Sequence, residues 1–267
     1  MSEEVNLYDS HYGHLAADPQ IQVRRETYGE DLGQASWITA GEARGWFDLL
    51  QIGAGRTALE VACGSGGITC AMARYSGAEC VGIDINAHGI NAAKNRAERD
   101  GLSSLVTFHT VDAGATLPFG AESFDAVFCN DSINHLPGRA AVLHDWHRLL
   151  RPGGCLLFTD PIVVTGQLSN EEIRTRSSIG FFLFTPVGQN EHLLENAGFR
   201  VRDVQDVTGA VASVSMKWRN ARARRREQLA PLEGEEGFEA LQRFLNVVHL
   251  LADERRLSRF MYLAEKR

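Results

Sequence analysis

Residues 60–67 of this 267-residue chain, Glu-Val-Ala-Cys-Gly-Ser-Gly-Gly, have the residue types of a ligand-binding turn. An apolar run (57–63) leads into them, and a segment with apolar residues at helical spacing (68–77) follows, which predicts a buried strand, a turn and a helix. Glycines in such a turn let a ligand approach the backbone, and the first N–H groups of the helix point toward it. A turn of this kind can also serve packing alone, so the surrounding residues must decide.

Two ligand patterns compete for this turn. A dinucleotide needs G-x-G-x-x-G, and counting from Gly64 the last position of that pattern is Thr69. An acidic residue followed by small residues is the other pattern, and it is matched by Glu60, Ala62, Gly64 and Gly66. We therefore expect a ligand that carries an amino-acid moiety, and a nicotinamide-dependent oxidoreductase stays the alternative.

Two aspartates follow the next two predicted strands. Asp84 ends the run 79–85, and Asp112 follows the run 105–111. At the end of a strand, one carboxylate can accept both hydroxyls of a ribose, and another can accept an exocyclic amine of adenine. Ile85 and Ala113, directly after them, are counted with the same site. Either aspartate alone could be a turn residue or a helix N-cap. Together, beside the glycine turn, they favour a nucleoside site.

The elements that would position these residues alternate along the chain. Apolar runs predict strands, helical spacing predicts helices between them, and the alternation implies an α/β fold with a parallel sheet covered on both faces. The strands are expected at 57–63, 79–85, 105–111, 124–130 and 155–160, with helices at 41–51, 68–77, 87–100 and 138–150. Later elements are a helix at 186–199, an edge strand at 200–207, helices at 211–229 and 236–251, and a last strand at 259–266.

This pattern gives one domain, 41–267, preceded by a cap segment, 1–40, and interrupted by two insertions, 161–185 and 208–254. Aromatic residues in these three segments have no place in the sheet pattern, as in Phe181-Phe182-Leu183-Phe184. We predict that the three segments together form a lid over the site, because active sites that exclude water commonly use such covers.

Composition excludes several classes of protein. Hydrophobic residues make up 44% and charged residues 23%, as in a soluble globular enzyme. The net charge of −7 argues against general nucleic-acid binding, and six basic residues within 217–226 are interpreted as a solvated helix face.

No apolar stretch is long enough to span a membrane, and the acidic N-terminus predicts no secretory signal. Five cysteines without CxxC spacing predict buried thiols in the cytoplasm. His144 and His147 are read as surface residues, and no metal is expected.

The whole series resembles the class I S-adenosylmethionine-dependent methyltransferases of the small-molecule type (methyltransferase type 11). Its motifs are E-V-A-C-G-S-G-G, V-G-I-D-I, V-D-A, F-D-A-V-F-C-N and R-P-G-G-C-L-L-F-T-D, in order between about residues 40 and 210. The resemblance implies a Rossmann-like three-layer sandwich with a seven-stranded, mostly parallel sheet and an antiparallel last strand. It implies S-adenosyl-L-methionine as cofactor and S-adenosyl-L-homocysteine as product.

The same resemblance assigns parts of the cofactor to residues of this chain. The methionine part is expected at Glu60, Gly64 and Gly66, the ribose at Asp84 and the adenine at Asp112 and Ala113, with Asn130 on the side of the fourth strand. Many members have glycine where this chain has Ala62, which is a small change.

A narrower resemblance, to phosphoethanolamine and sarcosine/dimethylglycine methyltransferases, starts after the fourth strand. Asp131 and His135 have the D-x-x-x-H spacing of the former, and residues 29–42 are similar to a segment of that family. This likeness adds Ile38 and Thr39, within that segment, to the expected cofactor residues. Arg24 stands where the family has its catalytic tyrosine; Tyr12 and Tyr28 are the candidates to replace it.

Methyl transfer to an amine or hydroxyl requires alignment of the acceptor and loss of a proton. We expect His135 to take that proton, with Asp131 orienting it from the same face of one helical turn. A role for His135 in orienting substrate or in packing stays open. An amine nitrogen is the favoured acceptor, with the oxygen or carbon of a natural product as alternatives and a non-catalytic cofactor-binding protein as a further one. The expected partner is a small molecule, and a homodimer is left open.

Overall fold

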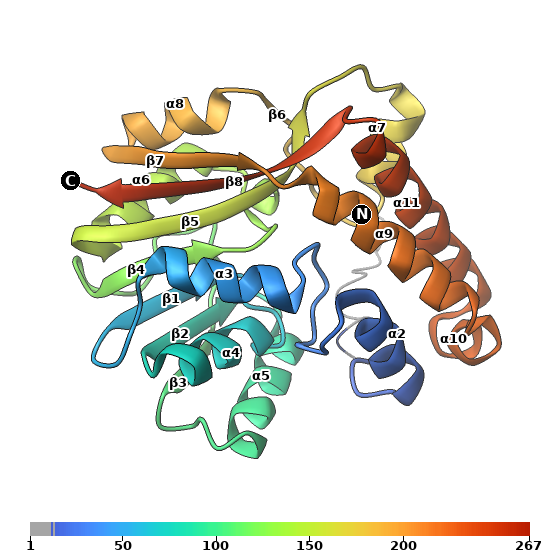
Figure 1. Ribbon diagram of the computed structural model, residues 1–267, viewed down its shortest axis with the longest axis horizontal. Coiled ribbons are helices and arrows are strands. Elements are labelled where there is room, and N and C mark those ends of the chain that lie inside the picture. Colours follow the sequence, from blue (N-terminus) through green and yellow to red (C-terminus); the bar gives the residue numbers. More distant parts are fainter. Residues whose placement is uncertain (1–11, 13) are drawn as a thin grey trace.

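The computed structural model describes Tyr12 and residues 14–267 (Figure 1). The beginning of the predicted cap segment, residues 1–11 and 13, lies outside the described residues. The predicted α/β fold is confirmed, with one twisted sheet between two layers of helices.

The sheet has the order β3-β2-β1-β4-β5-β8-β7, and a two-residue strand, β6, pairs with β5. Among the described strands, β8 alone runs antiparallel to its neighbours, β5 and β7. The strands are β1 (Thr57–Val61), β2 (Glu79–Asp84), β3 (Val106–Thr110), β4 (Phe124–Cys129), β5 (Leu150–Val164), β6 (Thr185–Pro186), β7 (Phe199–Asp206) and β8 (Leu257–Lys266). The sheet thus gains one short strand, β6, beyond the seven that were expected.

Strand residues alternate between the two faces of the sheet, as the pleat requires. Ala58 packs into the core cluster shared with α3 (Ala40–Leu50), α4 (Gly67–Ser76) and α5 (Ala87–Arg99). Its neighbour Leu59 packs into the opposite cluster with α6 (Arg139–Leu149) and α8 (Gln189–Asn196). Because both faces of the central strands are covered, these strands read as continuous apolar runs in the sequence.

The fifth strand is longer than predicted, and the first insertion therefore begins inside it. Pro161 lies within β5 although proline cannot donate a ladder hydrogen bond. The pairing of β5 with β8 shifts register between Asp160 and Val163, and such a bulge accommodates proline. The extension carries the chain past the edge of the sheet toward α7 (Asn170–Arg176).

A separate group of helices stands beside the edge where the parallel strands end (Figure 1). It contains α2 (Asp18–Tyr28), α9 (Thr208–Ala223), α10 (Arg226–Glu233) and α11 (Glu235–Asp253). Val23, Trp218 and Phe244 belong to the buried cluster that joins these helices. The single helix expected at 211–229 is two helices here, because the chain turns between Ala223 and Arg226.

All five cysteines are free thiols, and four of them are buried. No helix within the described residues has the length and apolar character needed to cross a membrane.

Candidate active site

Eight of the eleven predicted cofactor-binding residues line one cavity of about 900 Å³ at the carboxyl ends of β1, β2 and β4. Carboxyl ends of parallel strands meet at one edge of a sheet, and ligands of open α/β folds bind there. The eight are Glu60, Ala62, Gly64, Asp84, Ile85, Asp112, Ala113 and Asn130.

Backbone conformation explains the small residues of the turn after β1. Ala62, Gly64 and Gly66 have φ values of 59°, 54° and 69°, in the left-handed region. A Cβ on Gly66 would lie 2.6 Å from Cβ of Ala93 and 2.7 Å from the Phe108 ring. Gly66 therefore allows the turn to pack closely against α5 and β3, and it is not among the residues that line this cavity, unlike the prediction.

The carboxylate of Asp84 fastens this turn to the end of β2. Its two oxygens accept the backbone N–H groups of Gly64 and Asn86, each at 2.8 Å. Burial raises the pKa of the carboxyl in spite of these hydrogen bonds. Each carboxylate oxygen keeps a second lone pair, so Asp84 can also accept hydroxyl groups from a ligand in the cavity.

Glu60 is a buried carboxyl at the wall of the same cavity. The Thr69 hydroxyl donates to it, and burial raises its pKa to about 8. No arginine, lysine or histidine among the described residues forms an ion pair with it. A buried acid without a cation fits a ligand that brings positive charge. S-adenosylmethionine carries an ammonium and a sulfonium, so this wall fits that cofactor.

The residues of segment 29–42 that line the cavity differ from those expected. Ile38 is fully buried in the core beneath α3, and the Thr39 hydroxyl caps α3 by accepting the N–H of Glu42. Neither lines the cavity described above. The wall is instead formed by residues 32–36, because the Asn130 amide donates to the Ser36 hydroxyl at 2.7 Å and holds that stretch against the end of β4.

Of the three residues considered for the tyrosine position, only Tyr12 lines the first cavity. Its hydroxyl lies 2.5 Å from where a Cβ of Gly64 would be. Tyr28 is buried and donates to the Ser36 carbonyl. Arg24 forms a buried ion pair with Asp31, which fixes the loop after α2.

Asp131 does not orient His135, and the predicted pairing of these residues is wrong. One oxygen of Asp131 accepts from Arg259 Nε at 2.6 Å and from the Thr159 hydroxyl at 2.7 Å, and the other accepts the Trp37 N–H at 2.9 Å. The chain after Asp131 forms a 3₁₀ turn, Ile133–His135, so the spacing of an α-helix does not apply.

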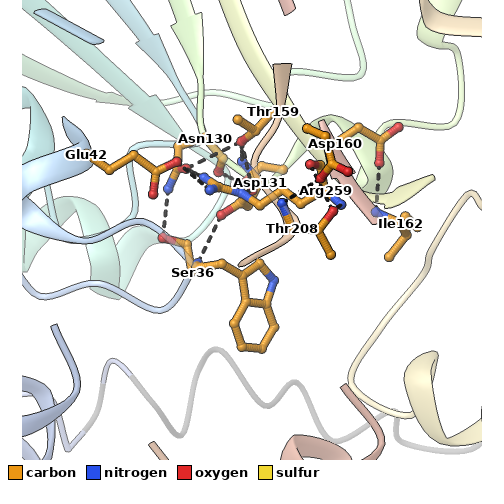
Figure 2. A network of polar contacts seen from close by, with 12 residues as sticks. Ser36, Glu42, Asn130, Asp131, Thr159, Asp160, Ile162, Thr208 and Arg259 are labelled. Atoms are coloured by element: carbon orange, nitrogen blue, oxygen red, sulfur yellow. Dashed lines mark hydrogen bonds and ion pairs between the residues drawn. The ribbon is translucent and has the colours of Figure 1, made fainter. Parts of the chain in front are cut away.

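Arg259 is the centre of the polar network around Asp131 (Figure 2). Its side chain is fully buried, and its guanidinium donates to Asp131, to Glu42 at 2.5 Å and to Asn130 at 3.2 Å. One residue of β8 thus ties the loop after β4 to helix α3. The side chain of Asp131 thus holds this loop in place, and the position of Arg259 in the last strand was not recognised from the sequence.

His135 takes its orientation from the first insertion. Its Nδ1 lies 2.8 Å from the carbonyl oxygen of Phe181, and its ring packs against Phe182 with centroids 4.5 Å apart. A carbonyl only accepts, so Nδ1 carries the proton and, in the neutral ring, Nε2 carries the lone pair. Burial, with the nearby charge of Arg176, lowers the pKa of His135 below its usual value.

A second cavity of about 130 Å³ adjoins the first, and Ala35, Ser36, Asp131, His135 and Ile179 line both. Its walls come from all three segments predicted to cover the site. They are largely apolar and aromatic, with Trp37, Phe182, Trp218, Leu241 and Phe244 among them.

A positive charge lies inside this aromatic wall. The guanidinium carbon of Arg176 lies 4.8 Å from the ring centre of Phe182, 5.2 Å from that of Phe244 and 6.0 Å from that of Trp37. These distances are those of cation–π contacts. The sequence drew attention to the phenylalanines but not to this arginine.

Basic residues between 217 and 226 are engaged within the protein. Arg222 pairs with Glu233, both Arg224 and Arg225 pair with Glu26, and Arg226 pairs with acidic residues of α11. These contacts join α9 and α10 to α2 and α11, so the face predicted to be solvated is partly used in packing, with Arg222 buried.

Comparison with known proteins gives the class of the domain. Residues 59–158 match the family model of a methyltransferase domain. The chain is 33% identical over 168 residues to methyltransferase GfsG of Streptomyces halstedii, covering 61% of this chain and 59% of that one. It is 30% identical over 163 residues to the 27-O-demethylrifamycin SV methyltransferase of Amycolatopsis mediterranei, covering 60% of each. The matched parts are therefore about three fifths of these relatives' own lengths.

The fold is shared with the phosphoethanolamine N-methyltransferase 2 of Haemonchus contortus, solved with S-adenosylhomocysteine. The TM-score is 0.81 at 20% identity, over 98% of this chain and 60% of that one. The family match identifies residues 59–158 as a methyltransferase domain, and the fold and the cavity at the strand ends agree with it. Its cofactor is S-adenosyl-L-methionine.

Proposed function

We propose that this protein methylates a hydroxyl oxygen of a small molecule held in the second cavity. The observation that carries the proposal is the position of His135, which lines both the cofactor cavity and the second cavity. An acceptor in the second cavity would meet His135 on the side that faces the cofactor. Bound S-adenosylmethionine would supply an electrophilic methyl group on its sulfonium.

The state of His135 supports a role as general base. A hydroxyl must lose its proton during methyl transfer, and a histidine that is neutral at physiological pH can take it. The lowered pKa of His135 keeps the ring neutral, and the Phe181 carbonyl holds the proton on Nδ1. The basic atom is therefore Nε2.

The position of Arg176 favours oxygen over the amine nitrogen that the sequence suggested. An amine acceptor is mostly protonated at neutral pH before it reacts, and its methylated product is again a cation, so either form would lie beside Arg176, which is already over three of the aromatic rings. Two cations about 4 Å apart repel by roughly 4 kcal/mol near a protein surface. A neutral hydroxyl avoids this cost. One relative, the rifamycin methyltransferase, is named for an acceptor at an oxygen.

The three segments around the second cavity are placed to exclude water and to bind one particular acceptor. The cap segment, the first insertion and the second insertion all contribute side chains to the second cavity. We propose that they close over the bound acceptor, since a closed site aligns the reactants and keeps water away from the reacting atoms.

A labelled cofactor tests the proposal. The protein would be incubated with S-adenosylmethionine carrying a ¹³C-methyl group and a small-metabolite extract, and the methylated product would be analysed by NMR. We expect a ¹³C shift typical of a methyl ether or ester. A label on nitrogen or carbon, or no transfer to any small molecule, would contradict the assignment.

A further inference from the structure

Asn134 has a buried amide that nothing in the described part of the chain satisfies. It lines the second cavity, its side chain is fully buried, and neither Nδ2 nor Oδ1 has a hydrogen-bond partner among the described residues. Burying a hydrogen-bond donor or acceptor without a partner costs free energy, and buried groups without a partner are rare in native proteins. An unsatisfied amide at the wall of a cavity points to a ligand that completes it.

The backbone around Asn134 holds the residue in place. Its carbonyl accepts the N–H of Leu183 at 2.9 Å, which joins the 3₁₀ turn to the first insertion. His135 is the next residue in the same turn, and both line the second cavity. A molecule that binds the Asn134 amide would thus place a neighbouring group beside His135.

The cavity limits the size of that group. Its volume is about 130 Å³, and a cavity of roughly 150 Å³ holds one benzene molecule. Its walls are mainly aromatic and aliphatic. One six-membered ring, or an apolar chain of that size, fits this space if its polar atoms lie on the side of Asn134 and His135.

We infer that Asn134 selects acceptors that carry a second hydrogen-bonding group next to the hydroxyl to be methylated, such as a vicinal diol or a hydroxy-carbonyl. The inference rests on the proposed function and names its substrate class. One amide atom pairs with the hydroxyl that is not methylated, and the methylated hydroxyl lies toward His135. An acceptor whose lone hydroxyl lies toward His135 makes no hydrogen bond to the Asn134 amide and binds less tightly.

A matched pair of ring alcohols tests the selection. The probes are cis-1,2-cyclohexanediol and cyclohexanol, titrated in the presence and absence of S-adenosylhomocysteine and followed by tryptophan fluorescence, since Trp37 and Trp218 line the cavity. One further hydrogen bond supports a preference for the diol of about tenfold. The preference is expected to fall to about one in Asn134→Leu, which keeps the side-chain size but removes both polar atoms.

The melting temperature of Asn134→Leu shows whether the Asn134 amide recognises a ligand or stabilises the fold. Replacing an unsatisfied amide by leucine is expected to raise the melting temperature, whereas removing a structural amide would lower it. Asn95→Leu, an exposed position on α5, is the matched control and should keep the preference for the diol. The inference is overturned if the wild-type protein does not bind the diol preferentially, if Asn134→Leu keeps the preference, or if Asn134→Leu melts at a lower temperature.

This test is independent of the proposed reaction because it measures binding without methyl transfer. A protein that transfers no methyl group but shows a preference dependent on Asn134 would contradict the proposed function alone. A protein that methylates a hydroxyl but shows no such preference would contradict the selection by Asn134 alone.

Discussion

The Nδ1 atom of His135 lies 2.8 Å from the carbonyl oxygen of Phe181, a residue of the first insertion. The position of the insertion and the protonation of the histidine are therefore coupled. When the insertion holds this geometry, the proton stays on Nδ1 and Nε2 is the basic atom.

The lowered pKa of His135 sets the expected dependence of the rate on pH. A histidine base acts in its neutral form, so the rate rises with pH through its pKa and is constant above it. Because burial lowers that pKa, we expect the midpoint of the rise in kcat to lie below about pH 6.5, the ordinary histidine pKa. Single-turnover rates between pH 5 and 9 check this. A midpoint clearly above the ordinary pKa would show that another group controls the rate.

Asp84 should contribute strongly to cofactor affinity. Asp84→Ala removes an acceptor for cofactor hydroxyls, at about 1.5–3 kcal/mol for each charge-assisted hydrogen bond, and it also releases the Gly64 N–H. Calorimetry with S-adenosylhomocysteine should show a loss of at least about tenfold. Asp100→Ala, which removes an ion pair with Arg74 at the end of α5, is the control. Equal affinities of the two variants would exclude Asp84 from the cofactor site.

Glu60 should make the stability of the ligand-free protein fall as pH rises. Its folded pKa of about 8 lies above the ordinary value of 4.5, so the folded state holds a proton that the unfolded chain has released. Stability is then lost between pH 4.5 and 8. Glu60→Gln removes this loss and should be more stable than the wild type at pH 9 by up to roughly 4 kcal/mol, with little difference at pH 5.

Urea unfolding of both proteins at pH 5 and pH 9 measures the effect of Glu60. In calorimetry at pH 7, cofactor binding to the wild type should also release a proton, because the positive charge of the ligand favours ionised Glu60. A stability difference that does not change with pH would contradict the raised pKa.

Substitutions of Arg259 and Asp131 should have strongly non-additive effects on the free energy of unfolding. Arg259→Met leaves Asp131 and Glu42 buried without their cation, which costs about 3–5 kcal/mol. Adding Asp131→Asn removes one of these charges, so the double variant should be more stable than Arg259→Met alone. A double-mutant cycle by urea unfolding measures the interaction. Simple addition of the two single losses would show that the ion pair does not organise this loop.

The sheet and the cofactor turn could be predicted because their signals are local. Apolar runs, glycines and strand-end aspartates each lie within a few residues of one another, and parallel topology brings the strand ends together. The segment 29–42 was harder. Its likeness to a family suggested Ile38 and Thr39, but the hydrogen bond between Asn130 and Ser36 places residues 32–36 at the cavity.

The second cavity could not be predicted because it is assembled from distant segments. Trp37, Arg176 and Phe244 come from three different parts of the chain, and no pattern in the sequence relates them. Arg259 is a charged residue in the mostly apolar first part of β8, which was a signal, but its partner Asp131 follows β4. The D-x-x-x-H spacing suggested a pair, whereas the left-handed backbone of Asp131, with a φ of 53°, and the 3₁₀ turn direct the two side chains to different partners.

The central claim, that His135 removes the proton of a hydroxyl acceptor, is tested most directly by the kcat of His135→Ala with the acceptor found by ¹³C labelling. General-base catalysis predicts a fall in kcat of about 10²–10⁴-fold, with unchanged affinity for S-adenosylhomocysteine and normal kcat in the control His144→Ala, an exposed histidine on α6. A His135→Ala enzyme with near-normal kcat on that acceptor would contradict the account and show that alignment alone drives the transfer.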